Sequence, residues 1–366
     1  MHTQSRLPNF LKLMDWGILI LACTIFGLGL VILYSASFQK TLEMNIHFPL
    51  RQLGWFIMSL VGFILVATYS YRKLIHFSYP LYTLNLLILF LTLLLGLVRF
   101  GAQRWLALGG FIFQPSEITK LIVIMALAQY MGHHQEKLSR FVGILVPMML
   151  VFIPAILIAL QPDLGTALVL IPMLFAMLFV AGAPLRLITI WIFLGCVASP
   201  ILWHFLKDYQ RDRLMVFLSP NVDPLGAGYT IIQSKIAIGS GSWLGKGWLS
   251  GTQNQLNFLP ERHTDFIFSV VGEEWGFAGV LILILLYFWL VRKLFQILRQ
   301  THDPYARLLA TGIVTMLVIH IFVNIGMACG IMPVVGLPLP LVSYGGSNLF
   351  TTMVGLGLVV NIQLRQ

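Results

Sequence analysis

Ten apolar segments, each near the length needed to cross a membrane, dominate this sequence. A membrane-spanning helix needs about 20 predominantly apolar residues. By that criterion the candidate spans are 16–36, 52–69, 77–97, 115–131, 141–160, 163–181, 184–205, 266–291, 308–328 and 342–363. Hydrophobic residues make up 58% of the chain, whereas soluble domains contain about 45–50%. The sequence therefore predicts an all-α integral membrane protein with ten transmembrane helices.

Lysine and arginine in the short connecting segments predict the orientation of these helices. Cytoplasmic loops carry an excess of these residues. With the N-terminus inside, the inner segments hold Arg6, Lys12, Arg72, Lys73, Lys137, Arg140, Arg186, Arg292, Lys293, Arg299, Arg307 and Arg365, and the outer ones hold Lys40, Arg51, Arg99 and Arg104. Both termini are predicted to be cytoplasmic. The net charge of +10 is scattered among apolar runs, which favours an anionic membrane surface and no nucleic acid partner.

A large loop, residues 206–265, separates the seventh and eighth predicted helices and lies on the outer side. Structureless loops of this length are uncommon in compact domains. The stretches "YTIIQSKIAIGS" and "LGKGWLSG" mix apolar, aromatic and glycine residues, which is typical of a folded or membrane-surface element. Within it, "IIQSKIAI" is predicted to form a short amphipathic helix with Gln233, Ser234 and Lys235 on or near its polar side. Residues 1–366 are treated as a single membrane domain that carries this loop.

Acidic residues indicate a polar site on the outer side. Ten of the 13 Asp and Glu residues fall outside or near the outer face, although carboxylates contribute little to topology. Glu117 and Lys120 follow Pro115 at one predicted helix start, and Asp163 opens another. These groups are either helix-start carboxylates with a local ion pair, or they face a polar cavity, because a lysine entering the membrane is costly.

The stretch "LPERHTDFIF", residues 259–268, concentrates charge immediately before an apolar segment. Glu261 and Arg262 are either a local pair or part of a site, and His263 is either an interfacial histidine or a substrate contact. Asp265 is either the cap of the eighth helix or a base, because desolvation at the membrane edge raises the pKa of a carboxyl.

Two further stretches are candidate substrate contacts. "KDYQRDR", residues 207–213, is either a solvated charged segment or a diphosphate site, for which the guanidinium groups of Arg211 and Arg213 are well shaped. "GIMPVVGLPLPLVSYGGS", residues 330–347, contains three prolines and no charge. Irregular backbone at membrane depth is tolerated where it packs in protein or lines a cavity, so this segment is either a wall of the site with Ser343 as its polar contact, or a simple loop.

Several of these motifs resemble one known family. "RWLALGGFIFQPSEITK", "QPDLGT", "DPLGAGYTIIQSKIAIGSG", "GKGWLSGTQNQLNFLPERHTDFIF" and "PLPLVSYGGS" are similar to motifs of the SEDS family (shape, elongation, division and sporulation), and more to its elongation members than to its division members. The resemblance runs from the first helix to the last. It implies a peptidoglycan glycosyltransferase of the bacterial inner membrane, with ten helices and a large periplasmic loop that carries the site.

The resemblance also implies a substrate, a cofactor and partners. Such proteins polymerise lipid II into β-1,4 glycan strands, use a divalent cation (Mg²⁺ or Mn²⁺), and work with a class B penicillin-binding transpeptidase and other membrane proteins of the elongation complex. The family's essential aspartate falls on Asp265.

The residues accommodate this chemistry. Our hypothesis is that Asp265 deprotonates the acceptor 4-hydroxyl and that direct displacement inverts the anomeric carbon, with undecaprenyl diphosphate as leaving group. Lys120, Arg104, Arg211 and Arg213 are candidates for holding the diphosphate. Glu117, Asp163 and Asp265 are possible cation ligands, without a definite assignment. The alternatives are a lipid II flippase and a noncatalytic scaffold for the transpeptidase.

Overall fold

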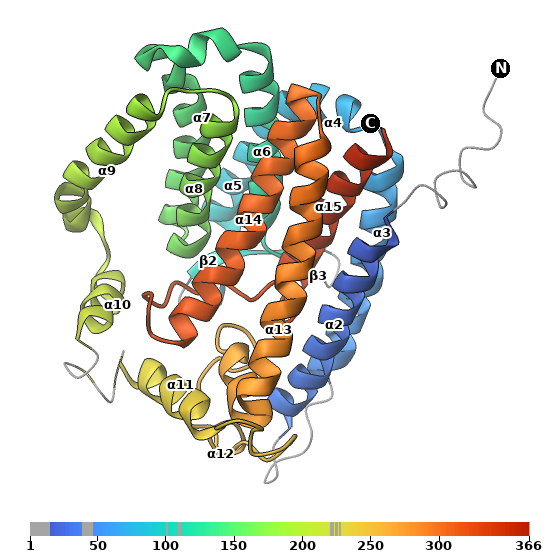
Figure 1. Ribbon diagram of the computed structural model, residues 1–366. Helices are drawn as coiled ribbons and strands as arrows, with labels where there is room; N and C mark the ends of the chain where they lie inside the picture. Colours follow the sequence, from blue (N-terminus) through green and yellow to red (C-terminus); the bar gives the residue numbers. More distant parts are fainter. Residues whose placement is uncertain are drawn as a thin grey trace.

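The protein is almost entirely helical in the computed structural model (Figure 1), which describes residues 15–38, 47–99, 102–108, 111–219, 223, 226 and 228–365. Each of the ten predicted spans coincides with a helix: α2 (Trp16–Ser37), α3 (His47–Thr68), α5 (Ser78–Leu95), α6 (Pro115–His133), α7 (Phe141–Leu160), α8 (Leu164–Val180), α9 (Leu185–Phe205), α13 (Ile267–Gln300), α14 (Pro304–Ala328) and α15 (Gly346–Leu364). The all-α membrane fold class is therefore confirmed. Arg6, Lys12 and Lys40, which contributed to the predicted orientation, lie outside the described residues.

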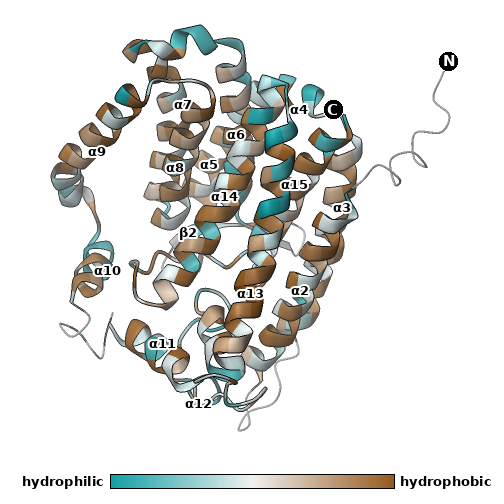
Figure 2. Ribbon diagram, viewed as in Figure 1, coloured by the Kyte–Doolittle hydropathy of each residue, from teal (hydrophilic) through white to brown (hydrophobic). Residues whose placement is uncertain are grey.

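Seven helices of the described chain are long and apolar enough to cross a membrane, namely α2, α3, α5, α7, α13, α14 and α15. The count of ten crossings stays a prediction. Hydrophobic residues predominate along the middle of the long helices, and hydrophilic residues gather toward their ends (Figure 2).

Helices α14 and α15 form the centre of the bundle. The most apolar stretch of α15 is 78% buried and that of α14 is 61% buried, compared with 28% for α3 and α5. Helix α14 packs against α8, α6 and α13, and α15 packs along α3. Peripheral helices expose large apolar side chains such as Leu65, Leu95 and Phe193, as expected where the outer surface contacts lipid.

The large loop predicted over residues 206–265 is folded in its described parts. It contains α10 (Asp208–Leu218), α11 (Tyr229–Ser240) and α12 (Thr252–Gln255), so the predicted helix over "IIQSKIAI" is confirmed. Helices α11 and α12 lie at one end of the bundle, and the short helix α4 (Tyr71–His76) and the C-terminal end of α15 lie at the other (Figure 1). A 3-10 helix, η1 (Gln135–Ser139), follows α6.

The sequence did not predict the small antiparallel sheet between α5 and α6. Its strands, β1 (Leu97–Arg99), β2 (Ala102–Leu108) and β3 (Phe111–Phe113), are ordered β1-β2-β3. Leu97 pairs with Trp105, and Leu106 pairs with Phe113. The sheet carries Arg104 on its central strand, so it determines where this cation lies.

Helix α13 is interrupted at Gly276, whose φ of 62° and ψ of −160° are not helical. The glycine-rich turn after α11 packs into this break. The Lys246 N–H donates to the Glu273 carbonyl (3.0 Å), and the Phe277 N–H donates to the Ser242 carbonyl (2.9 Å). These bonds satisfy backbone groups that the interrupted helix leaves without partners. The turn and the N-terminal part of α13 therefore form one packed unit.

Candidate active site

A compact backbone turn holds Asp265 directly before α13. The Glu261 carbonyl accepts the N–H groups of Thr264 (3.1 Å), Asp265 (3.1 Å) and Phe266 (3.3 Å). Glu261 itself has a left-handed φ of 49°. The residue that caps α13 is Phe266, and no side chain caps this helix start. The interpretation of Asp265 as a helix cap is therefore wrong.

Two polar side chains from the bundle fix this turn in position. The Asn324 side-chain amide, on α14, donates to the carbonyls of Asp265 (3.0 Å) and Leu337 (2.7 Å). The Ser343 hydroxyl donates to the Thr264 carbonyl (2.5 Å). The proline-rich segment thus packs against the Asp265 turn, as predicted for a wall of the site. Ser343 was predicted as a substrate contact, but its hydroxyl is engaged with backbone and positions the turn.

The surroundings of Asp265 raise the pKa of its carboxyl toward neutral pH. Burial raises the pKa of this carboxyl to about 6; the negative charges of Glu261 and Asp163 also raise it, whereas the positive charges of Arg104 and Arg213 lower it. These four predicted residues are therefore electrostatic neighbours of Asp265. A carboxylate with a pKa near 6 is ionised at pH 7 and can still accept a proton efficiently, as a general base must.

The other charged residues of the "LPERHTDFIF" stretch have mainly structural contacts. The His263 ring lies 4.8 Å from the Phe48 ring between centroids, and burial lowers the pKa of His263. The Arg262 Nε donates to the Ala36 carbonyl (2.7 Å), which attaches the turn to α2. Glu261 accepts from the Thr264 hydroxyl instead (3.2 Å), so the predicted local pair of Glu261 and Arg262 does not form.

Asp163 caps α8 and is also the centre of a small polar cluster. Its Oδ1 accepts from the Thr166 N–H at 3.3 Å, which confirms the predicted helix start. Its Oδ2 accepts from the Gln114 amide (2.7 Å) and the Ser116 hydroxyl (3.0 Å). The Arg104 guanidinium lies 3.8 Å from Oδ1. The cluster thus places Arg104 beside Asp163, and the positive charge of Arg104 also acts on Asp265.

Glu117 and Lys120 form a fully enclosed pair at the start of α6. The Lys120 Nζ lies 2.9 Å from each carboxylate oxygen of Glu117 and 2.9 Å from the His320 Nε2 on α14. The Asn348 amide, on α15, donates to Glu117 at 2.9 Å. Lys120 has no exposed surface and Glu117 has 3%. The local ion pair is therefore confirmed, and the polar surroundings of Lys120 are protein side chains instead of an open cavity.

The two arginines of "KDYQRDR" differ in their contacts. The Arg211 guanidinium donates to the carbonyls of Trp203 (3.2 Å) and His204 (2.9 Å) at the end of α9. These two bonds cap the C-terminal end of α9, and the predicted role of Arg211 as a diphosphate ligand stays a prediction. Arg213 donates to the Val334 carbonyl at 3.3 Å. Arg213 thus reaches the proline-rich wall, and its charge acts on Asp265.

Helix α11 buries one residue that was predicted to be on or near its polar side. The Ser234 hydroxyl is fully buried and lies 2.6 Å from both the Ser269 hydroxyl and the Ala328 carbonyl. Ser234 therefore joins α11 to α13 and α14, and its hydroxyl is engaged within the protein. Gln233 is partly exposed and Lys235 is exposed, so these two remain available on the surface of α11.

Sequence reasoning missed three residues that organise the site, Asn324, Asn348 and His320. Each is a polar side chain inside an apolar helix, and that placement is a signal for a buried network. No group of three or more His, Cys, Asp or Glu side chains in the described chain is arranged to hold a metal ion. The predicted divalent cation therefore stays a prediction without assigned ligands.

The fold and site define an integral membrane protein with a carboxylate-centred site at one end of its helical bundle. Residues 15–366 match the FtsW/RodA/SpoVE family of cell cycle proteins. Peptidoglycan glycosyltransferase MrdB of Escherichia coli (strain K12) is 44% identical over 351 residues, which cover 95% of this chain and 93% of that protein. The chain therefore belongs to the FtsW/RodA/SpoVE family.

Solved structures of similar proteins also match this chain. A chain of the structure described as "Structural coordination of polymerization and crosslinking by a peptidoglycan synthase complex" matches with a TM-score of 0.83 and 37% identity, over 96% of this chain and 97% of that chain. The rod shape determining protein RodA of Thermus thermophilus matches with a TM-score of 0.69 and 34% identity, over 96% of each chain. The likeness thus extends over nearly the whole described bundle.

Proposed function

We propose that the protein is a peptidoglycan glycosyltransferase of cell elongation that polymerises lipid II, with Asp265 as its general base. The observation that carries this proposal is the Asp265 carboxyl, whose pKa is raised to about 6 and whose backbone turn is bonded by Asn324 and Ser343. The names of its relatives as peptidoglycan glycosyltransferases support the reaction class.

In the proposed step, the Asp265 carboxylate removes the proton from the 4-hydroxyl of the acceptor sugar. The resulting oxygen attacks the anomeric carbon of the donor, and the bond from that carbon to the diphosphate breaks. The electron pair of that bond leaves with undecaprenyl diphosphate. One β-1,4 bond is thus formed, one bond to the diphosphate is broken, and the proton of the acceptor hydroxyl ends on Asp265. One base and no covalent intermediate are sufficient, and the anomeric carbon is inverted.

Cations beside Asp265 would stabilise the departing diphosphate. Arg104 and Arg213 are the two whose charges act on Asp265, and an arginine fork matches phosphate geometry. Lys120 is committed to Glu117 and His320, so it supports the α6 helix start. A divalent cation would bind together with the diphosphate and would be held by at most one or two protein carboxylates, because Mg²⁺ usually binds through substrate phosphates.

We further propose that the protein lies in the bacterial inner membrane with both termini cytoplasmic and Asp265 on the periplasmic side. The excess of Lys and Arg in the segments at the opposite end supports this orientation. The likeness to a chain of a peptidoglycan synthase complex supports a class B penicillin-binding transpeptidase of the elongation complex as partner.

The test is polymerisation of lipid II by the full chain, with and without that transpeptidase, in the presence of Mn²⁺. Glycan strands from the wild type and none from folded Asp265→Asn protein are the expected result. A flippase would instead move lipid II across vesicle membranes without forming strands. A scaffold would do neither, and either outcome with an active positive control would overturn the proposal.

A further inference from the structure

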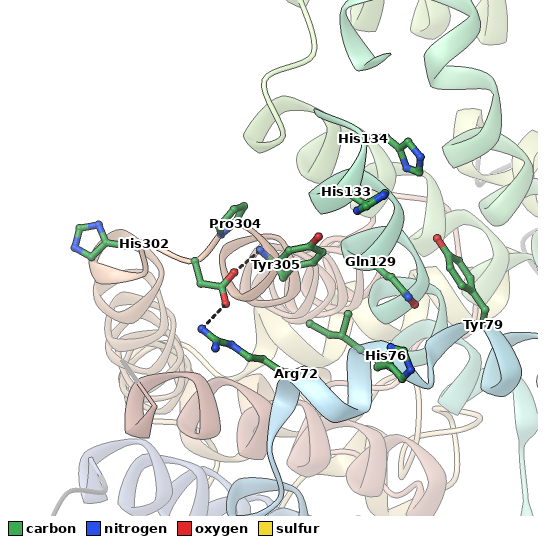
Figure 3. A pocket seen from close by; sticks show the side chains of 11 residues that line it. Arg72, His76, Tyr79, Gln129, His133, His134, His302, Pro304 and Tyr305 are labelled. Atoms are coloured by element: carbon green, nitrogen blue, oxygen red, sulfur yellow. Dashed lines mark hydrogen bonds and ion pairs between the residues drawn. The ribbon is translucent and has the colours of Figure 1, made fainter. Parts of the chain in front are cut away.

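A cavity of about 890 Å³ lies at the end of the bundle opposite Asp265, between α4, the end of α6 and the start of α14. Four histidines line it: His76, His133, His134 and His302. In Figure 3, Arg72, His76, Gln129 and Tyr305 surround the same space, and His302 stands at its outer edge. The volume is that of a small-molecule site, and the proposed chemistry at Asp265 does not use it.

Hydrogen-bond donors dominate the lining. N–H or O–H groups are supplied by the Arg72 guanidinium, the imidazoles, the Tyr79 and Tyr305 phenols and the Gln129 amide. Gln129 accepts a hydrogen bond from Ser78 through its Oε1, so its amide N–H₂ is directed elsewhere. In the part of the chain that the structure describes, the side chains of His76, His133 and His302 form no hydrogen bond. The cavity is therefore lined with unused donors.

One carboxylate, Asp303, lines the cavity, and its charge is already compensated. Its Oδ2 accepts from the Tyr71 hydroxyl (2.7 Å) and lies 3.4 Å from the Arg72 guanidinium. Its Oδ1 accepts the Tyr305 N–H (3.0 Å) and caps α14. The Arg72 side chain is 74% exposed, so much of its guanidinium surface remains available. With the one carboxylate paired, the remaining N–H and O–H donors of the lining favour an anion over a cation.

One wall of the cavity continues into an apolar surface of α5. Tyr79 lies near the start of this helix, and the exposed residues Leu87, Phe90 and Leu94 follow at spacings of 8, 11 and 15 residues. In a helix these spacings fall on one side. A molecule with its anionic group in the cavity can therefore lay acyl chains along α5. Basic pockets between transmembrane helices on the cytoplasmic side bind anionic lipid headgroups in this way.

We propose that this cavity binds the phosphate of an anionic phospholipid from the cytoplasmic leaflet. Arg72 and the imidazoles contact the phosphate oxygens, and α5 contacts the acyl chains. The phosphate of a soluble metabolite could make the same contacts in the cavity, but it has no acyl chains to pack along α5. A lipid is therefore the favoured ligand. The site does not depend on Asp265, so its failure would leave the polymerase proposal intact.

The test is calorimetric titration of the detergent-purified full chain with dihexanoyl phosphatidylglycerol, dihexanoyl phosphatidylcholine and inorganic phosphate. The phosphatidylglycerol is expected to bind at least about tenfold more tightly than the other two. The double variant R72Q/H133N is expected to weaken that binding about tenfold or more. Both side chains are exposed, and an exposed ion pair contributes only about 0–1 kcal/mol to stability, so the variant is expected to fold.

The matched control is R186Q/H204N, which removes the same two side-chain types from exposed positions outside the cavity. It is expected to bind phosphatidylglycerol like the wild type. Binding of inorganic phosphate as tight as that of the lipid would assign the cavity to a soluble phosphate and overturn the lipid source. Equal binding of phosphatidylglycerol by the wild type and R72Q/H133N would remove the site altogether.

Discussion

Two carboxylates near the N-terminal end of α13, Asp265 and Glu273, are eight residues apart in sequence and have opposite surroundings. Glu273 is fully buried and accepts from Lys246 Nζ (2.9 Å), the Thr252 hydroxyl (3.1 Å) and the Gln253 N–H (2.9 Å). Among the described residues, no donor forms a hydrogen bond with the Asp265 carboxylate. A saturated carboxylate stabilises structure, whereas one that keeps its lone pairs can take a proton from a substrate.

The substitution with the largest expected effect is Asp265→Asn. The amide keeps the shape of the side chain and removes its basicity, so glycan polymerisation should fall about 10²–10⁴-fold, the usual contribution of a general base. The apparent Tm should stay equal or rise, because a carboxyl with a raised pKa opposes folding when it ionises. Gel analysis of strands with thermal unfolding checks both. Retained polymerisation would remove Asp265 from the mechanism.

Glu273→Gln should show the reverse pattern. An amide cannot accept all the hydrogen bonds of the carboxylate, and the Lys246 ammonium loses its partner. The expected loss of stability is about 1–3 kcal/mol, measured as a lower apparent Tm in detergent. Polymerisation per folded molecule should change little. Loss of polymerisation with an unchanged Tm would mean that Glu273, too, belongs to the chemistry.

The pH dependence of polymerisation distinguishes the two carboxylates further. Asp265 acts only when ionised, and its pKa is raised to about 6. The rate should therefore be half-maximal near pH 6 and level off above about pH 7, so that at pH 5 it is roughly tenfold below the plateau. The Glu273→Gln protein should keep the same profile. A profile without a rise between pH 5 and 7 would contradict Asp265 as the base.

Ser343→Ala tests how far the turn positions Asp265. The change removes the hydrogen bond to the Thr264 carbonyl, so the rate constant of polymerisation should fall a few-fold, with a loss of about 1 kcal/mol in stability. The pH profile should keep its midpoint. A weaker affinity for lipid II with an unchanged rate constant would return Ser343 to its predicted role as a substrate contact.

The smallest effect is expected from Arg211→Ala, compared with Arg213→Ala. The Arg211 guanidinium caps α9, so polymerisation should stay within about twofold of the wild type at limiting lipid II. Arg213 acts on Asp265, and its loss should lower the rate more and raise the midpoint of the pH profile, because a cation that lowers the pKa is removed. Equal effects of Arg211→Ala and Arg213→Ala would contradict the inference that Arg213 acts on Asp265 whereas Arg211 only caps α9.

Most of the fold could be predicted from the sequence, because the membrane imposes length and composition on each helix. Residues 141–160, for example, were predicted as a helix with the bounds that the structure has. The sheet that carries Arg104 was missed because its strands are only three to seven residues long. Such short apolar runs carry little periodicity.

The site was predictable only in part. Asp265 could be singled out from its charge beside an apolar helix, but the partners of Glu117 and Asp265, such as Asn348 and Asn324, lie far away in sequence. Ser234 was misplaced because a serine suggests a polar helix face. Instead, its hydroxyl meets Ser269 and a backbone carbonyl from another helix, and such pairing across helices leaves no trace in local periodicity.

The break at Gly276 has a mechanical consequence for the whole molecule. A continuous helix is held by its ladder of backbone hydrogen bonds, whereas just after Gly276 the N–H groups of Phe277 and Ala278 donate to the carbonyls of Ser242 and Trp243 in the turn. A Cβ on Gly276 would lie 2.3 Å from the Gly245 nitrogen, so the joint admits only glycine without displacing the turn. The N-terminal segment of α13, which follows Asp265, is thus joined to the rest of the helix through the packed turn as well as through the chain itself, and a side chain at Gly276 would displace that turn and disturb the segment that follows Asp265.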